Sequence, residues 1–208
     1  MIPLRPLTLV ALLTVAALSA NAAANTDPTA VQPGTYTIEP SHTRVLFAVD
    51  HFGTSTWYGD FTHVSGTLKL DPRNLAASEV KVSVPTDSLS TTNADLDETL
   101  KSADWFNVES FPTMTFKSTR VTSTGPGRAS IEGDLTLHGV TRPVVLQARF
   151  KGAAGPNAIL RAYQIGFDIR GKIKRSDFGL RKYLATVGDD VDLIISAPFN
   201  RSAASAGH

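Results

Sequence analysis

The stretch YTIEPSHTRVLFAVDHFG, residues 36–53, carries the strongest structural signal in the chain. Three apolar side chains in it alternate with polar or small ones: Val45, Phe47 and Val49. Successive side chains of a β-strand point to opposite faces, so this alternation predicts a strand with one buried face. Pro40 interrupts the pattern before the strand, and Gly53 ends it. We therefore predict a strand over residues 44–51 that follows a turn.

Most of the remaining chain also has strand character. Further strands are predicted over residues 35–39, 59–71, 78–85, 113–122, 128–138, 142–152, 159–174 and 190–200. Turn signals such as Gly125-Pro126-Gly127 separate them, as antiparallel hairpins require. Residues 95–103 have helical spacing instead, with Asp95 and Glu98 placed for a capping box. The pattern predicts an all-β domain with one short helix after the fourth or fifth strand.

The first 22 residues have the features of a secretory signal peptide. Arg5 supplies the positive charge, residues 7–18 form an apolar run, and Ala20-Asn21-Ala22 supplies a cleavage pattern. A second pattern allows cleavage after residue 24, and the apolar run is shorter than the ~20 residues that span a bilayer. We expect a periplasmic protein with a flexible lead over residues 23–33, one domain over 34–201 and a polar tail over 202–208.

Charge and cysteine content limit the function classes. The chain has 20 Lys and Arg against 19 Asp and Glu, so loss of Arg5 with the signal leaves the mature side chains neutral. A neutral protein has no global attraction to nucleic acid or to an anionic membrane. Cys is absent, so an exported domain must rely on its core or on closed hydrogen bonding. We expect no nucleic-acid partner and no stable membrane span.

The residues that carry metal or catalytic chemistry do not form a known motif. His42 and His51 have odd spacing, so on one continuous strand they point to opposite faces, about 30 Å apart. The chain has no HExxH spacing, no G-x-S-x-G nucleophile and no Cys. We expect no catalytic residues, no metal and no cofactor.

Residues 36–53 resemble the opening of the YceI-like family, with Glu39 where the family usually has Asp and Thr43 where it usually has Ser. Further blocks similar to the family follow in the expected order, at residues 97–118, 133–141, 175–179 and 187–191. Members are exported bacterial proteins with a lipocalin-like barrel that binds polyisoprenoid lipids. About eight antiparallel strands with one apolar face each are compatible with a sandwich or a closed barrel. The resemblance implies the single antiparallel lipocalin-like barrel.

The resemblance also implies a non-enzymatic carrier whose ligand, a polyprenyl or isoprenoid-quinone chain, lies in an apolar lumen. The inward-facing residues expected to line that lumen are Phe47, Val49, Met114, Phe116, Ile131, Leu135, Leu137, Leu146, Phe167, Ile169, Leu193 and Ile195. The residues placed at the pocket mouth are His51, Trp105, Phe106, Arg175, Asp177 and Phe178. Residues 175–179 are alternatively a structural corner, with an Arg–Asp ion pair, a buried Phe and a Gly at positive φ.

Two other functions remain open on the sequence alone. The same apolar side chains are compatible with a filled barrel that has only a structural or interaction role. A periplasmic enzyme acting on a small amphiphile would need polar groups that converge in the lumen. Alternation of residues along a strand does not separate a hollow barrel from a filled one. The sequence also leaves the oligomeric state open, and a dimer is possible.

Overall fold

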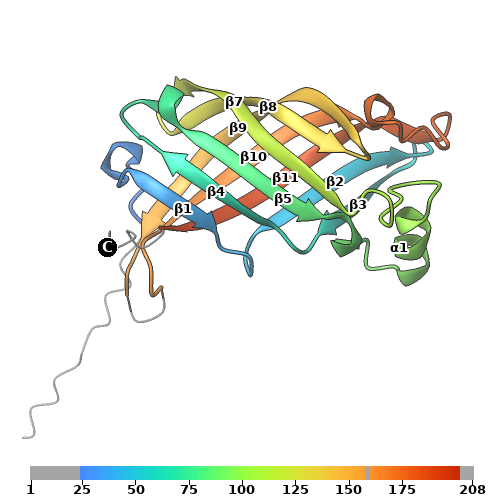
Figure 1. Ribbon diagram of the computed structural model, residues 1–208, viewed down its shortest axis with the longest axis horizontal. Helices are drawn as coiled ribbons and strands as arrows, with labels where there is room; N and C mark the ends of the chain where they lie inside the picture. Colours follow the sequence, from blue (N-terminus) through green and yellow to red (C-terminus); the bar gives the residue numbers. More distant parts are fainter. Residues whose placement is uncertain (1–23, 158–159, 202–208) are drawn as a thin grey trace, which may run out of the picture.

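The computed structural model describes residues 24–157 and 160–201 (Figure 1). The predicted signal peptide and the polar tail therefore lie outside the described residues. Most of the described chain forms one antiparallel sheet. Its strands are β1 (Gly34–Ile38), β2 (Arg44–His51), β3 (Ser55–Phe61), β4 (Ser65–Leu70), β5 (Glu79–Pro85), β6 (Leu89–Ser90), β7 (Thr113–Gly125), β8 (Arg128–Leu137), β9 (Val140–Ala154), β10 (Gln164–Lys174) and β11 (Val187–Arg201).

The sheet closes on itself. Eight strands form the ring, in the order β1-β4-β5-β7-β8-β9-β10-β11, and β11 then pairs with β1. The closing register places Tyr36 opposite Arg201 and Ile38 opposite Phe199. Closure satisfies the backbone groups that an edge strand would expose, without any disulfide. The predicted antiparallel barrel of about eight strands is confirmed.

Three strands extend the sheet beyond this ring. The first part of β11 pairs with β2, which pairs with β3, which in turn pairs with the short β6. The predicted strand over residues 59–71 is therefore two strands, because the chain leaves the ladder at residues 62–64 between β3 and β4. This break and the short β6 explain why the helix follows the sixth strand rather than the fourth or fifth.

The one α-helix among the described residues, α1, spans Ala94–Lys101. Its N-cap is Asn93, whose side chain accepts a hydrogen bond from the backbone N–H of Leu96 at 3.1 Å. The predicted capping box of Asp95 and Glu98 is wrong, because both residues lie inside the helix. Asp95 instead sits in the first turn, where a carboxylate is favoured by the helix dipole.

The segment expected as a flexible lead makes specific contacts in the described part of the chain. Asn25 exchanges two backbone hydrogen bonds of 2.8 Å with Ala153 of β9. Val31 is buried, and the phenol of Tyr36 donates to the carbonyl of Gln32. These contacts fasten the residues before β1 to the end of the barrel.

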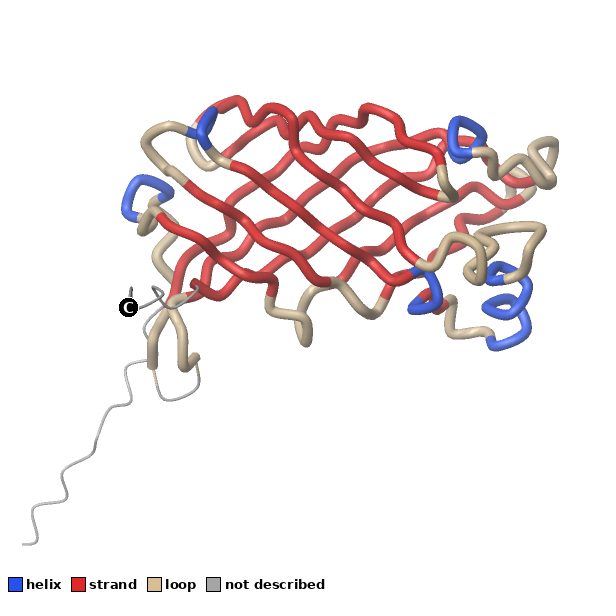
Figure 2. The backbone as a smooth tube through the Cα atoms, viewed as in Figure 1, coloured by secondary structure: helices blue, strands red, loops and turns tan. Residues whose placement is uncertain are grey.

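The helical segments sit at the two ends of the barrel (Figure 2). Besides α1 they are the short 3₁₀ helices η1 (Pro28–Ala30), η2 (Leu75–Ala77), η3 (Thr86–Ser88) and η4 (Arg175–Phe178). No helix within residues 24–157 and 160–201 is long and apolar enough to cross a membrane. In Figure 1, α1 and the orange-red segment that contains η4 lie at the same end of the barrel. We call this the loop end.

Candidate binding cavity

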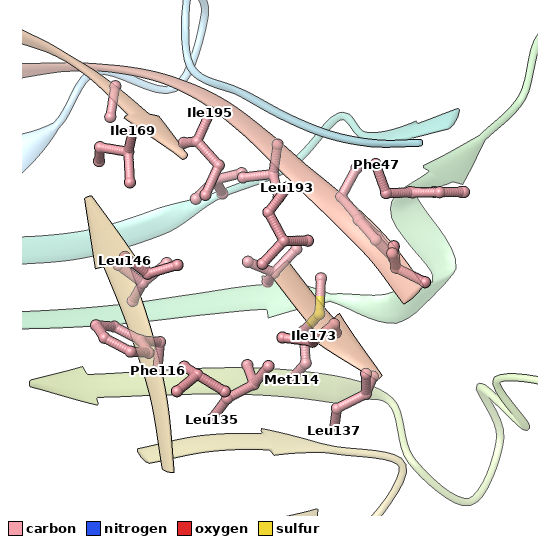
Figure 3. Close-up of a pocket in the computed structure, with 18 of the residues that line it drawn as sticks. Phe47, Met114, Phe116, Leu135, Leu137, Leu146, Ile169, Ile173, Leu193 and Ile195 are labelled. Atoms are coloured by element: carbon pink, nitrogen blue, oxygen red, sulfur yellow. The ribbon is translucent and has the colours of Figure 1, made fainter. Parts of the chain in front are cut away.

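The barrel encloses a cavity of about 750 Å³. This volume falls within the ~300–1,000 Å³ typical of sites for small organic ligands. The structure places all twelve predicted lumen residues in the cavity wall. Figure 3 draws 18 of the lining residues, ten of them labelled, around this cavity. Aliphatic and phenyl side chains dominate the wall along most of the barrel. A long apolar molecule therefore finds a continuous apolar surface.

The lumen is hollow rather than filled. Seven of the predicted lumen residues face inward and are still only partly buried: Phe47, Val49, Leu135, Phe167, Ile169, Leu193 and Ile195. Side chains in a filled core would pack against one another at close to crystal density and lose their accessible surface. The remaining surface of these residues borders the cavity. The filled-core alternative is therefore inconsistent with the geometry.

Glycines in the wall help to keep the lumen open. The ring of Phe47 on β2 lies over Gly59, its direct partner on β3, so closely that a Cβ at residue 59 would be 2.4 Å from the ring. Phe116 on β7 reaches over Gly133 on β8, which lies diagonally across from it, and a Cβ at residue 133 would be 2.5 Å from that ring. Because neither glycine has a side chain, each ring occupies the space that a Cβ at the glycine would take.

Strand β8 shows how alternation separates the two faces. Leu135 and Leu137 point into the cavity, whereas Thr136 between them faces outward. The hydroxyl of Thr136 lies 2.8 Å from that of Thr141 on β9, its direct cross-strand partner. The inner face of this strand is thus apolar and the outer face is hydrogen-bonded.

Polar groups gather at the loop end of the cavity. The lining residues there that carry a polar atom are His51, Trp57, Asn93, Asp95, Thr99, Trp105, Arg175 and Tyr183. Phe106, also predicted at the mouth, lines the cavity beside them. The ring centroid of Trp105 lies 6.2 Å from that of Tyr183, and the centroids of His51 and Trp57 are 6.1 Å apart. The cavity therefore has one long apolar part and one polar end.

Two residues predicted at the mouth lie elsewhere. Phe178 is 1% exposed and belongs to the main buried core, while Asp177 is exposed outside the cavity lining. Residues three apart in a 3₁₀ helix share a face, so Arg175 and Phe178 of η4 are both buried while Asp177 points outward. Of the four residues of η4, only Arg175 lines the cavity. Gly179 has the expected positive φ, 83°, which lets the chain reverse after η4.

Arg175 is a buried structural cation. Its guanidinium donates four hydrogen bonds of 2.8 Å to backbone carbonyls, two in the loop after η4 and two at the start of β11: those of Leu180, Lys182, Val187 and Gly188. The predicted ion pair with Asp177 is replaced by these carbonyls. Burial lowers the pKa of Arg175, an effect that the charge of Asp189 opposes. The guanidinium carbon lies 5.6 Å from the ring centroid of Trp105, which fixes the position of that indole.

Trp57 is a cavity residue that our sequence reasoning missed. It lies on β3 opposite Val49, two residues before the start of the predicted strand. The alternation of Trp57, Gly59 and Phe61 on one strand face was the available signal. Extending the predicted strand toward its N-terminal side would have placed Trp57 on the inner face.

The four histidines that the structure describes, His42, His51, His63 and His138, do not form a metal site. Within residues 24–157 and 160–201, no group of three His, Cys, Asp or Glu side chains is arranged to hold a metal ion. The exposed His42 instead contacts Glu39, with 2.6 Å between Nδ1 and Oε2. Burial raises the pKa of Glu39, but hydrogen bonds from His42 and Ser41 outweigh it and leave that pKa below its usual value. The Glu-Pro-Ser-His turn thus has a structural role.

Comparison with known proteins adds a family to this geometry. A family model described as YceI-like domain matches residues 36–199. The chain belongs to this family. Protein YceI of Escherichia coli O157:H7 is 42% identical over 159 residues, which cover 76% of this chain and 81% of the relative.

Solved structures share the fold of the family. The YCEI protein of Campylobacter jejuni superposes with a TM-score of 0.65 and 29% identity, covering 74% of this chain and 90% of its own. A protein domain from Saccharophagus degradans superposes with a TM-score of 0.62 and 12% identity, covering 82% of this chain and all of its own. The latter is described as a polyisoprenoid binding domain implicated in plant cell wall breakdown. At that identity the likeness concerns the fold.

Proposed function

We propose that this protein is a non-enzymatic periplasmic carrier that holds the chain of a polyprenyl or isoprenoid-quinone lipid inside its barrel. The observation that carries the proposal is the hollow apolar lumen of about 750 Å³. Membership of the YceI-like family and the polyisoprenoid-binding domain among the structural neighbours support it. The predicted signal peptide supports export.

The lining favours a long apolar ligand on energetic grounds. Burying one CH₂ group contributes about 0.8 kcal/mol, so about fifteen carbons contribute ~12 kcal/mol before the costs of association. An apolar wall offers contact area but few directional interactions. The chain of the lipid therefore dominates the affinity, and selectivity has to come from the polar loop end.

Native mass spectrometry of protein purified from the periplasmic fraction tests the proposal directly. We expect an added mass that corresponds to a lipid, and organic extraction should release an isoprenoid compound. N-terminal sequencing of the same sample should find a start at residue 23 or 25. Protein that carries no lipid and takes up none from isoprenoid micelles would contradict the carrier function.

A further inference from the structure

Exposed hydrophobic side chains gather at the loop end of the barrel. Within residues 24–157 and 160–201, five large hydrophobic side chains are exposed, and three of them lie in two turns: Phe52 after β2, and Tyr183 and Leu184 before β11. Phe52 and Tyr183 are each 60% exposed, and Leu184 is 40% exposed. We call these three residues the apolar tip. Single exposed hydrophobic residues are normal, but a group of them points to an interaction site.

The two turns form one surface. Strands β2 and β11 are antiparallel neighbours with His51 opposite Val187, so the end of β2 lies beside the start of β11. The backbone N–H of Phe52 donates to the carbonyl of Thr186 at 2.7 Å. The N–H groups of Thr186 and Val187 both donate to the carbonyl of Tyr183, at 3.0 and 2.8 Å. Main-chain hydrogen bonds therefore hold the tip together, and they do not depend on its side chains.

The backbone of the tip favours other residues than those present. Phe52 and Tyr183 have positive φ angles of 60° and 57°. Bulky residues rarely adopt this conformation, whereas Gly and Asn adopt it more readily. Phe52 is followed by Gly53 with a φ of 63°, a pair of positive angles for which Asn-Gly is a preferred sequence. The ring of Phe52 packs on the neighbouring His51, with 4.6 Å between centroids, yet stays exposed. An exposed aromatic ring thus occupies a position that asparagine would suit better.

The tip adjoins the cavity. Tyr183 belongs to both, because it lines the cavity and is exposed. His51, which precedes Phe52, also lines the cavity, and so does Val187 at the end of the other turn. A bilayer in contact with the tip would therefore lie next to this end of the lumen. For a lipid carrier, that position places the cavity beside the source of a molecule that water does not dissolve.

The size of the tip suits a bilayer better than a protein partner. A large aromatic side chain has roughly 150–250 Å² of surface, so three partly exposed side chains offer on the order of 300 Å². A specific protein interface of standard size buries about 800 Å² on each partner. Insertion into the interfacial region of a bilayer needs no matching surface, and aromatic side chains and leucine favour that region.

The charges that accompany the two turns are balanced. Arg181 and Lys182 precede Tyr183, and Lys182 forms an ion pair with Asp104. Asp50 lies at the other turn, where its carboxylate accepts a backbone hydrogen bond of 2.9 Å. Two basic side chains thus accompany two acidic ones. Apolar contact, rather than attraction to an anionic surface, is therefore the force that this end offers to a bilayer.

We propose that the apolar tip docks the barrel on a phospholipid bilayer, so that lipid passes between the bilayer and the cavity without crossing water. The inference rests on the proposed lipid-carrier function and adds the surface through which the carrier is loaded. Docking is peripheral and reversible, because only three side chains insert.

Flotation with vesicles tests the docking itself, using the mature protein freed of lipid. Vesicles of phosphatidylcholine alone and of phosphatidylcholine mixed with phosphatidylglycerol are compared at low and high salt. We expect the protein to float with both, and salt to change the bound fraction less than about twofold, since the contact is apolar. The double variant Phe52→Asn/Leu184→Ser should bind vesicles about tenfold more weakly, because binding scales with the apolar area that inserts.

Two controls accompany the double variant. Its midpoint of urea unfolding should not fall, because asparagine tolerates the positive φ at residue 52 and the exposed Leu184 lies outside the core. Tyr58→Thr removes a side chain of similar exposure, 56%, from the outer face of β3, outside the tip. This variant should float like the native protein. An equal loss in Tyr58→Thr would contradict a specific role of the tip.

Lipid uptake gives an independent readout. Uptake of a polyprenol from phosphatidylcholine vesicles should slow about tenfold in the double variant, in proportion to its weaker docking. Affinity for the same polyprenol supplied in detergent micelles should change less than about twofold, because neither Phe52 nor Leu184 lines the cavity.

The outcomes separate this inference from the carrier function. If the polyprenol binds from neither source, the carrier function and the loading role fail together. If it binds from micelles but the native protein floats with neither vesicle, or floats no better than the double variant, the carrier function stands and docking is refuted. Flotation only with phosphatidylglycerol and only at low salt would overturn the apolar tip in favour of charge attraction. Self-association that the double variant loses, without flotation, would show that the tip joins two copies and would equally overturn docking.

Discussion

The substitution Leu135→Gln tests whether the inner face of β8 touches the lipid. Leu135 lines the cavity and is only partly buried, so its exposed surface borders the lumen. Glutamine has a similar length but places an amide against an apolar ligand, with aliphatic and phenyl neighbours such as Phe116 on the adjacent strand. An unpaired buried amide costs about 1–3 kcal/mol. Lipid affinity should therefore fall by roughly 5- to 150-fold.

The measurement compares lipid retention, by native mass spectrometry and by titration of delipidated protein, with urea unfolding of the same samples. In the lipid-free protein the new amide borders a cavity that admits water, so the free energy of unfolding should change little. Thr136→Gln is the matched control on the outer face of the same strand. It removes the contact with Thr141 but should leave lipid affinity unchanged.

Two results would refute this reasoning. Equal loss of binding in Leu135→Gln and Thr136→Gln would mean that the two faces of β8 are not functionally distinct. Unfolding of lipid-free Leu135→Gln would mean that the lumen behaves as a packed core.

Four further predictions follow from single features of the structure. Gly59→Ala forces the ring of Phe47 out of the space above residue 59 and into the lumen. The amount of lipid bound in the titration should therefore fall several-fold, and the protein should lose about 1–3 kcal/mol of stability. An unchanged amount of bound lipid would contradict the role of this glycine. Arg175→Met leaves four backbone carbonyls, in the loop after η4 and at the start of β11, without their donor. Urea unfolding should therefore show a loss of roughly 2–4 kcal/mol that Arg175→Lys does not restore, because an ammonium lacks the planar fork. Burial raises the pKa of Asp189, but hydrogen bonds from Ser176 outweigh it and leave that pKa below its usual value. The stabilisation by Asp189 is therefore complete above the unfolded-state pKa of about 3.9, and it is lost as pH falls through the lower folded-state pKa. In Asp189→Asn, the free energy of unfolding should depend less on pH in that range. Dialysis against a chelator should leave melting and lipid content unchanged, since the described residues hold no three-ligand cluster; a loss that zinc restores would overturn this.

Much of the cavity wall was predictable because alternation is a local property of the backbone. Once a segment is a strand, residues two apart share a face, and all twelve lumen residues came from that rule. The rule failed where the strand limits were wrong, as at Trp57, and where the chain was not a strand. At η4 the 3₁₀ geometry places Arg175 and Phe178, three residues apart, on one buried face and Asp177 toward solvent, a period of three that strand alternation does not describe.

The sequence by itself determined the all-β class, the position of the helix along the chain and the apolar inner face, because these depend on the periodicity of nearby residues. Only the tertiary structure decided that the barrel is closed and hollow. Closure depends on pairing between β1 and β11, segments at opposite ends of the domain. The free volume depends on which residue lies across from each large side chain, as Gly59 lies across from Phe47. Such partners are set by strand register, which local alternation does not encode.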